Sequence, residues 1–369
     1  MNQPDRRKNI WLHGSYFGSN FGDLLLVSEA RKLISEQGNS SVALPFCAPS
    51  SLRAMNVSRG WGGLISSPER VVFCGGGYFG EPGKSIDEWT RRFNYRHGVA
   101  LWAAMEKAKR PPIAVGIGFG PISATKIRDK VVRALSACEI CHFRDEESLH
   151  YFEKYGGRVS DGMAVTTDLA IGLHGTSIES PQKIEQLHRK GVRVGLIHLV
   201  DKYEEKSHLL SIISAMIELI KQKGDDWRFF VIMDGKGRGY SKTKQERAAD
   251  YLLESALSCG LEVGKINFED CDTTMAYLAN ADYVLTSKLH VGIVSSAFGR
   301  NVCAIPYHPK TPRFYRQMDE AWRCFSSLDW RPQSILEHAK SVLESNCPVK
   351  IPQAMLDAAD RNKAALFSI

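Results

Sequence analysis

Residues 281–305 read ADYVLTSKLHVGIVSSAFGRNVCAI, and the order of elements in this stretch decides the fold. The apolar run at 281–286 predicts a strand, residues 288–298 predict a helix that begins directly after it, and residues 301–305 predict the next strand. A helix that connects two short apolar strands is typical of a parallel sheet covered by helices on both faces. This stretch therefore predicts an α/β protein.

The same alternation extends along the chain in two series. Strands are also expected at 9–14, 41–47, 70–74, 112–116, 140–143, 164–167, 192–199, 227–233 and 263–268. Helices are also expected at 23–36, 87–109, 127–137, 146–155, 208–221, 243–258, 273–280, 316–321, 332–344 and 352–365. Residues 172–191 are rich in Gly, Ser, Pro and charge, and they predict a linker or a surface segment between the series. We therefore expect two Rossmann-like domains that face each other across a cleft, at 1–175 and 190–345, and a C-terminal helix at 346–369.

The composition excludes several classes of protein. The chain has 369 residues, of which 24% are charged, and this excludes a disordered or coiled-coil chain. The net charge of +7 favours an anionic partner, but no nucleic-acid motif accompanies the basic segments. Nine cysteines, most of them in apolar runs, and a polar N-terminal segment favour reduced thiols in a cytoplasmic protein. No apolar run is long enough for an integral membrane segment, and no spacing of ligands indicates a metal site.

Three glycine-rich segments directly follow predicted strands. They are residues 14–23, the triplet Gly75, Gly76 and Gly77, and residues 116–121. Because the carboxyl ends of parallel strands meet at one edge of a sheet, we expect the three segments to converge there. Glycine lets a backbone approach an anionic ligand closely, and a helix N-terminus adds positive partial charge. The alternative for the triplet is a tight bend after the strand, and the alternative to an active-site role for Asp23 is a helix N-cap.

Basic residues stand at the carboxyl ends of other predicted strands. They are Arg144 after residues 140–143, Lys288 and His290 after residues 281–286, and Lys310 after residues 301–305. A guanidinium group matches the oxygens of a carboxylate or a phosphate, and a histidine transfers protons readily near neutral pH. These residues predict a site for a phosphorylated ligand, and Asp168 is a further candidate for it. For Arg144 the alternative is a surface ion pair with Asp145 or Glu147.

Seven short motifs together give the chain a family resemblance. In chain order they are GSNFGD at 18–23, FCGGG at 73–77, GIGFGPI at 116–122, FRDEES at 143–148, TTDLA at 166–170, SKLHVGI at 287–293 and IPYHPK at 305–310. In this order and spacing the chain resembles the polysaccharide pyruvyl transferases. It departs from them at Lys288, where relatives usually carry Arg, so the charge is kept and the bidentate fork is lost.

The resemblance implies a fold and a reaction. The fold is similar to that of the B-type glycosyltransferases. The reaction takes pyruvate from phosphoenolpyruvate and places it as a ketal across two hydroxyls of a sugar, with release of phosphate. Asp23, Arg144, His290 and Lys310 match functional positions of the family. His290 is expected to be the principal acid or base, and Asp23 a base or positioning group on the acceptor side.

The resemblance also implies the remaining parts of the site. Phosphoenolpyruvate would bind to Arg144, Lys288, Leu289 and Lys310, and the acceptor side would use Asn20 and the glycine triplet. We expect no cofactor besides the co-substrate, and an acceptor sugar that is either free or part of a lipid-linked oligosaccharide. The protein would then work in the cytoplasm, and at the inner face of the membrane for a lipid-linked acceptor. The sequence does not decide whether it forms homo-oligomers.

Two other functions fit the same residues. A B-type glycosyltransferase with a nucleotide-sugar donor would need a similar cation-lined cleft. A non-catalytic scaffold of polysaccharide assembly would be favoured by Lys288 in place of arginine, but the retained Asp23, Arg144 and His290 argue against it.

Overall fold

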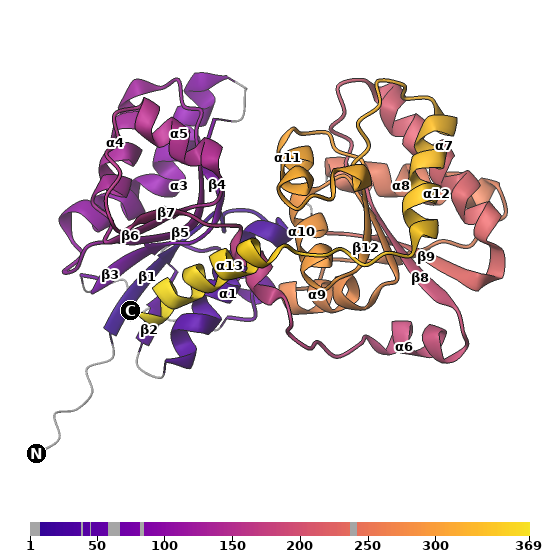
Figure 1. Cartoon of the computed structure of the whole chain (residues 1–369), viewed down its shortest axis with the longest axis horizontal. Coiled ribbons are helices and arrows are strands. Elements are labelled where there is room, and N and C mark those ends of the chain that lie inside the picture. Colours follow the sequence, from indigo (N-terminus) through magenta and orange to yellow (C-terminus); the bar gives the residue numbers. More distant parts are fainter. Residues whose placement is uncertain (1–7, 38–39, 45, 58–66, 82–84, 237–241) are drawn as a thin grey trace, which may run out of the picture. The chain divides into compact units, whose positions relative to one another are not determined.

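The computed structural model describes residues 8–37, 40–44, 46–57, 67–81, 85–236 and 242–369, and it divides into two compact units (Figure 1). Unit 1 comprises Met1–Gly18, Asp23–Gly172 and Gln353–Ile369. Unit 2 comprises Ser19–Gly22 and Leu173–Pro352. Each unit is built on a parallel β-sheet, so the α/β class predicted from the alternation of strands and helices is confirmed.

The sheet of unit 1 has the strand order β2-β1-β3-β5-β6-β7, with β4 paired to β5. The strands are β1 (Lys8–His13), β2 (Ser40–Ala43), β3 (Arg70–Phe73), β4 (Gly76–Phe79), β5 (Ile113–Phe119), β6 (Ile140–Phe143) and β7 (Met163–Val165). Every residue of β5 is buried, as expected for a parallel strand that is covered on both faces. The order of the strands reverses between β1 and β3, and ligands of doubly wound sheets bind beyond the carboxyl ends of strands at such a point.

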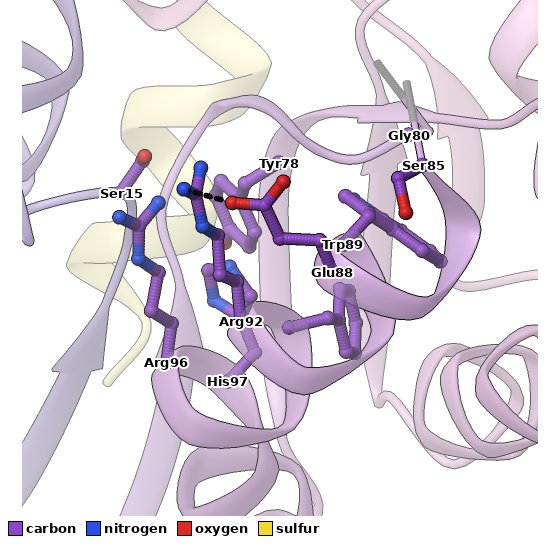
Figure 2. A pocket seen from close by; sticks show the side chains of 10 residues that line it. Ser15, Tyr78, Gly80, Ser85, Glu88, Trp89, Arg92, Arg96 and His97 are labelled. Atoms are coloured by element: carbon purple, nitrogen blue, oxygen red, sulfur yellow. Dashed lines mark hydrogen bonds and ion pairs between the residues drawn. The ribbon is translucent and has the colours of Figure 1, made fainter. Parts of the chain in front are cut away.

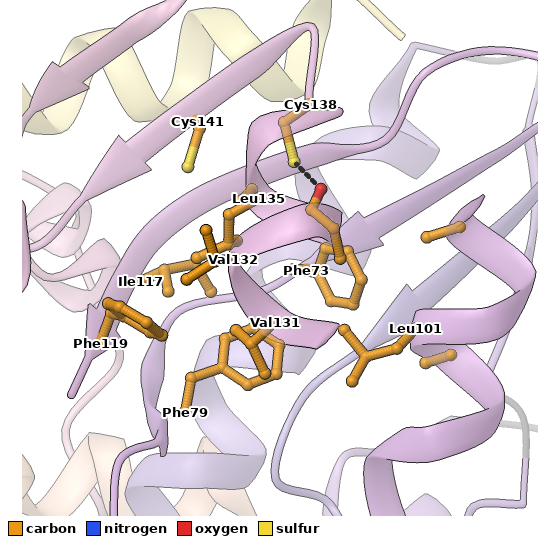
Figure 3. Close-up of a cluster of buried hydrophobic side chains, with 14 of the residues drawn as sticks. Phe73, Phe79, Leu101, Ile117, Phe119, Val131, Val132, Leu135, Cys138 and Cys141 are labelled. Carbon is orange, nitrogen blue, oxygen red and sulfur yellow. Dashed lines mark hydrogen bonds between the residues drawn. The ribbon is translucent and has the colours of Figure 1, made fainter. Parts of the chain in front are cut away.

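The helices of unit 1 pack on this sheet around an apolar core. They are α1 (Phe21–Glu36), α2 (Pro49–Ala54), α3 (Ile86–Glu106), α4 (Thr125–Ser136), α5 (Glu146–Lys154) and α13 (Gln353–Phe367). Figure 3 shows the core between β3, β4 and β5 and the helices α3 and α4, where Phe73, Phe79 and Ile117 meet Leu101 and Val131. All five side chains are almost fully buried.

The C-terminal helix α13 belongs to unit 1, although the chain reaches it only after completing unit 2. Its Asn362 is fully buried, and the side-chain amide donates to the Thr167 carbonyl at 2.9 Å. The amide oxygen accepts a hydrogen bond from the Thr166 hydroxyl at 3.0 Å and lies 2.9 Å from Nδ1 of His142. A buried amide with all these partners explains why the helix expected as a separate C-terminal element packs on the first sheet.

The sheet of unit 2 has the strand order β10-β9-β8-β11-β12, all in parallel pairs. The strands are β8 (Arg193–His198), β9 (Trp227–Ile232), β10 (Gly264–Ile266), β11 (Tyr283–Thr286) and β12 (Asn301–Ala304). The helices are α6 (Gln182–Arg189), α7 (Lys206–Lys223), α8 (Lys244–Ser258), α9 (Cys271–Asn280), α10 (Leu289–Ala297), α11 (Lys310–Gln317) and α12 (Pro332–Ser345). The strand order reverses between β8 and β11, so this is the switch point of unit 2.

Three local expectations differ from the structure. Gly76 and Gly77 of the triplet open the strand β4, which pairs with β5, whereas the sequence predicted only a loop or a bend. The segment at 172–191, expected as a linker or surface segment, contains α6. The helix expected at 316–321 is wrong, because α11 occupies Lys310–Gln317 and a turn with Asp319 at φ +58° follows it. Pro312 lies in the first turn of α11, where proline is tolerated.

No helix in the described part of the chain is both long enough and apolar enough to cross a membrane.

Candidate functional site

The principal candidate site of unit 2 lies at the carboxyl ends of β8, β9 and β11. His198 ends β8, Asp234 follows β9 by two residues, and Lys288 follows β11 by two residues. These strands are neighbours around the switch point of the sheet, where the topology brings residues from distant parts of the sequence together. The site predicted from the sequence at Lys288 and His290 therefore includes two partners from β8 and β9.

Asp234 binds the two basic side chains of this site. Its carboxylate forms an ion pair with the ammonium group of Lys288. The other carboxylate oxygen lies 3.3 Å from Nε2 of His198, whose side chain is fully buried. Gln245 of α8 contacts both residues. Its Nε2 lies 2.8 Å from Nε2 of His198, and its Oε1 accepts a hydrogen bond from the backbone N–H of Asp234 at 3.2 Å.

The carboxylate of Asp234 stays ionised in this buried place. Burial by itself raises the pKa of an aspartic acid, but the positive charge of Lys288, followed by His198, outweighs it and holds the pKa of Asp234 well below its ordinary value. The ammonium group of Lys288 is therefore fixed in position by a charged partner. The sequence analysis missed Asp234, and the signal for it was an aspartate that directly follows an apolar strand and precedes a glycine.

The turn from β11 into α10 is held by the side chain of Thr286. The Thr286 hydroxyl accepts from the backbone N–H of Lys288 at 3.0 Å and donates to its carbonyl at 3.2 Å. Lys288 is the N-cap residue of α10, and its backbone is extended. Leu289 and His290 then form the first turn of the helix, and the N-terminus of a helix favours an anion.

The segment Ser19–Gly22 packs against this site within unit 2. The backbone N–H of Phe21 donates to the Asp234 carbonyl at 2.8 Å, and the Ser19 hydroxyl donates to the Lys236 carbonyl at 2.5 Å. A Cβ atom on Gly22 would lie 2.3 Å from Cγ of the His290 ring, so only glycine lets the backbone pass beside the imidazole. The motif that contains Asn20 thus contributes to the surroundings of His290.

Asp23 lies in the first turn of α1 and not at its N-cap, because the helix begins at Phe21. The N-cap alternative for Asp23 is therefore not what the structure shows. A carboxylate in a first helical turn is stabilised by the helix dipole. Asp23 belongs to unit 1 and His290 to unit 2.

A second cluster of basic groups follows β12 in unit 2. Lys310 begins α11, and its backbone N–H donates to Nδ1 of His308 at 3.3 Å. The pKa of His308 is lowered by burial, and in addition by the positive charges of Lys310, Arg313 and Lys202. These three cations are therefore close enough to act on one imidazole. The sequence analysis singled out Lys310 but missed the other two cations. Lys202 follows β8, and Arg313 lies inside α11.

Arg144 occupies a restrained position in unit 1. Its Nε lies 3.6 Å from a carboxylate oxygen of Asp145, and its Nη1 lies 3.6 Å from a carboxylate oxygen of Asp168. The side chain of Arg144 is only 10% exposed. The pair with Asp145, which was one of the alternatives, exists, but it is buried instead of lying on the surface. Asp168 joins the same cluster from the segment after β7.

Glycines shape the backbone around Arg144. A Cβ atom on Gly118 would lie 2.9 Å from Nη2 of Arg144 and 3.2 Å from Cα of Gly77. A Cβ atom on Gly75 would lie 3.2 Å from the Gly116 carbonyl oxygen, and Gly76 has φ +111°. Glycines are therefore required in the motifs at 73–77 and 116–122, because β4 approaches β5 closely there and because the guanidinium group of Arg144 occupies the neighbouring space. Contact of the triplet with an acceptor stays a prediction.

The comparison with protein families identifies one family. A family model described as polysaccharide pyruvyl transferase matches residues 20–309, which is most of the chain. The matched range includes all seven motifs described above except Gly18 and Ser19 at the start of the first and Lys310 at the end of the last. A comparison with curated protein sequences finds no match.

Solved structures resemble the whole chain. The UDP-GlcNAc 2-epimerase from Neisseria meningitidis, solved bound to UDP-GlcNAc, has a TM-score of 0.60 at 13% identity, covering 98% of this chain and 99% of that chain. The UDP-GlcNAc 2-epimerase from Methanocaldococcus jannaschii, solved with UDP-GlcNAc and UDP, has a TM-score of 0.58 at 10% identity, again covering 98% of this chain and 99% of that chain. At these identities the likeness shows the fold alone, which is GT-B-like with two Rossmann-like domains.

Proposed function

Because the chain belongs to the polysaccharide pyruvyl transferase family, we propose that it transfers pyruvate from phosphoenolpyruvate to a sugar of a polysaccharide or of its lipid-linked precursor. The product is a ketal that bridges two hydroxyls of the sugar, and phosphate is released. The observation that carries the proposal is the ordered Lys288–Asp234–His198 cluster next to His290 at the N-terminus of α10. A phosphorylated and carboxylated donor needs several fixed cations, and this position adds the partial charge of a helix end.

The proposed reaction consists of protonation of the donor, addition of a first hydroxyl, loss of phosphate and addition of a second hydroxyl. A proton is added to the methylene carbon of phosphoenolpyruvate, and the electrons of the C=C bond form the new C–H bond, which leaves an oxocarbenium-like centre at the neighbouring carbon. A sugar hydroxyl attacks that centre and loses its proton to a base. The C–O bond to phosphate then breaks, and phosphate leaves with the bonding electrons. The second hydroxyl attacks the same carbon, loses its proton, and closes the ketal.

The roles of the residues follow from this chemistry. We assign the principal acid or base role to His290, because an imidazole carries protons near neutral pH. Lys288 would neutralise phosphate or carboxylate charge. Its ion pair with Asp234 supports this role, because the pair restricts the position of an ammonium group that lacks the bidentate geometry of arginine. Arg144 and Lys310 would supply further cations, and Asp23 would serve as base or positioning group on the acceptor side.

Substitution of His290 tests the proposal directly. His290→Ala should lower kcat for acceptor-dependent phosphate release by about 100-fold or more, since general acid–base groups typically contribute about 10²–10⁴-fold. His188→Ala is the matched control, because His188 is an exposed histidine of the same unit that pairs with Asp282, which precedes β11, whereas His290 follows that strand. Full transfer activity in a folded His290→Ala protein would remove His290 from the mechanism.

Donor binding separates the proposal from its alternatives. Phosphoenolpyruvate should raise the thermal unfolding temperature of the protein, because a ligand that binds only the folded state stabilises it. UDP-GlcNAc and other nucleotide sugars serve as the comparison, and protection by them alone would favour a glycosyltransferase. A protein that binds phosphoenolpyruvate but releases no phosphate with any sugar acceptor would instead be a scaffold.

A further inference from the structure

The helix α3 of unit 1 has three sides with different surroundings. One side packs into the core of the unit. A second side lines a pocket of about 200 Å³ together with Ser15 of the loop after β1 and Tyr78 of β4 (Figure 2). Arg92 of this lining forms an ion pair with Glu88. The third side is exposed to solvent, although it carries large apolar side chains.

The exposed side of α3 carries an apolar stripe. Tyr95, Val99 and Trp102 follow one another at intervals of four and three residues, so they share one face of the helix. Their exposed fractions are 85%, 38% and 50%. A single exposed apolar side chain is ordinary on a protein surface, whereas a row of such side chains on one face is a feature of interaction sites.

Positive charge is concentrated around this stripe. Residues 86–136, which comprise α3, β5 and α4, contain ten basic and four acidic residues, so they carry +6 of the net charge of +7. The helices α3 and α4 pack beside each other, and both contribute to the core on the same face of the sheet, so their outer sides face the solvent together (Figure 1). The basic balance of the chain therefore belongs mainly to this part of unit 1.

Some of these cations are neutralised by carboxylates and others are not. Ion pairs hold the side chains of Arg92, Lys109, Arg110 and Arg128. Within the described part of the chain, five exposed cations of the two helices and their ends form no ion pair: Arg91, Lys107, Lys126, Lys130 and Arg133. The carboxylates of Asp87 and Glu106 are likewise exposed and form no ion pair with a described residue. Five positive groups thus stand against two negative ones.

The stripe and the cations lie close to each other. The ammonium group of Lys107 lies 5.2 Å from the centroid of the Trp102 ring, which is a cation–π distance. Lys126, Lys130 and Arg133 follow one another at intervals of four and three residues, so they share the outer side of α4. The outer faces of the two helices therefore combine aromatic rings with cations whose charge is not compensated by an ion pair.

This combination matches the surface of an anionic lipid bilayer. Indole and phenol rings have an apolar body and a polar tip, and they settle at the level of the lipid head groups. Lysine and arginine side chains near such a surface are attracted by its negative potential. A second copy of the chain fits less well, because it would bring the same uncompensated positive charge to the interface.

We propose that the face formed by Tyr95, Val99 and Trp102 of α3 and by the cations of α4 docks on an anionic lipid surface. The inference goes beyond the proposed function, because adsorption to lipid requires neither donor nor acceptor. Its use by the enzyme rests on the proposed function, since a lipid-linked sugar would be met at such a surface.

Flotation of the full chain with lipid vesicles tests the proposal. One set of vesicles contains equimolar phosphatidylcholine and phosphatidylglycerol, and the other contains phosphatidylcholine alone. Partition onto the anionic vesicles should be at least about tenfold stronger, because several cations near the surface each contribute. It should also weaken as the ionic strength rises. Equal partition onto both sets, or partition onto neither, would overturn the proposal.

Removal of charge connects the binding to α4. The triple variant Lys126→Gln, Lys130→Gln and Arg133→Gln should weaken partition onto anionic vesicles by about tenfold or more. The matched control removes the same charge from exposed positions of unit 2, in the triple variant Lys190→Gln, Lys221→Gln and Lys350→Gln. An equal loss in the two triple variants would show only the general attraction of a basic protein and would contradict the proposal.

Removal of the aromatic rings connects the binding to α3. The double variant Tyr95→Ala and Trp102→Ala should weaken partition onto anionic vesicles by about fivefold, because less apolar surface then enters the head-group region. Leu257→Ala is the control, since Leu257 is a 78% exposed apolar side chain on α8 of unit 2. Sedimentation velocity without lipid gives the second measurement. A double variant that changes the protein from dimer to monomer and keeps full vesicle binding would assign the stripe to a second copy and overturn the proposal.

The outcome is separable from that of the proposed function, because vesicle binding is measured without phosphoenolpyruvate and without a sugar. If the protein binds anionic vesicles through α3 and α4 but transfers no pyruvate, the docking face stands and the proposed reaction fails. If pyruvyl transfer to a free sugar occurs and the protein does not bind the vesicles, the reaction stands and the docking face is wrong.

Discussion

At the scale of single residues, the position of the Lys288 ammonium group depends on its ion pair with Asp234. The sequence places a cation at the start of α10, but the structure shows that its ammonium group is held by a buried carboxylate from the segment after β9. Lysine lacks the bidentate fork of the arginine that relatives usually carry. A fixed ion pair compensates in part, because it limits the positions that a flexible side chain can take.

Asp234→Asn should destabilise unit 2 and weaken donor binding. Removal of one partner of a buried pair leaves an uncompensated charge and costs about 3–5 kcal/mol, and the cost should fall at the low end here because the Lys288 side chain is 21% exposed. The free energy of unfolding, measured by urea titration, checks the expectation. The double variant Asp234→Asn with Lys288→Met should recover part of the loss; a double variant less stable than Asp234→Asn would contradict the pairing.

At the scale of secondary-structure elements, α3 illustrates how one helix serves two purposes. Its buried face, with Phe93, Leu101 and Ala104, packs into the core of unit 1. Its first three turns present Trp89, Arg92 and other side chains to the pocket. The periodicity of the sequence predicts the helix and its apolar face, whereas the pocket depends on the loop after β1 and on β4, which lie far away in sequence.

Gly98 weakens the middle of α3 without a packing reason. A Cβ atom at this position would meet nothing within 4 Å, and the helix runs without interruption from Ile86 to Glu106. Gly98→Ala should therefore stabilise unit 1 by about 0.5–1 kcal/mol, because alanine loses less backbone entropy in a helix. The measurement is the midpoint of thermal or urea unfolding.

Gly118→Ala is the comparison for Gly98→Ala, since a Cβ atom there would press on the guanidinium group of Arg144. We expect this substitution to destabilise the protein. Destabilisation by Gly98→Ala as well would mean that the backbone at Gly98 has a role that its surroundings do not reveal.

At the scale of the whole molecule, acid sensitivity should arise from buried histidines. His13 and His97 are buried side by side in unit 1 and hydrogen-bonded to each other. Burial lowers the pKa of His13 from 6.5 to about 3. The folded state therefore keeps this ring neutral, while the unfolded chain takes up a proton below about pH 6.5. Stability from this group is complete above that pH and is lost as the pH falls towards 3.

Replacement of His13 should reduce this pH dependence. At pH 5 the unfolded state gains about 2 kcal/mol from protonation of one such histidine, since each pH unit below the unfolded pKa is worth about 1.4 kcal/mol. In His13→Gln the difference in the free energy of unfolding between pH 7.5 and pH 5 should shrink by about that amount. The control is His150→Gln, which replaces an exposed histidine on α5 outside the buried pair. An unaltered pH dependence in His13→Gln would assign the acid sensitivity to other groups.

The sequence by itself determined the class of fold, most of the strands and helices, and the family. Short apolar strands and amphipathic helices follow from local patterns, and residues such as Arg144, Lys288 and His290 stand at strand ends that can be found by periodicity alone. The tertiary structure decided which groups meet. Asp234 reaches Lys288, Asn362 brings α13 back to the first sheet, and Ser15 and Tyr78 complete a pocket with α3. These contacts join segments that are distant in the chain, and the order of strands in a sheet, which brings them together, is set by the packing of the whole domain and leaves no local periodicity in the sequence.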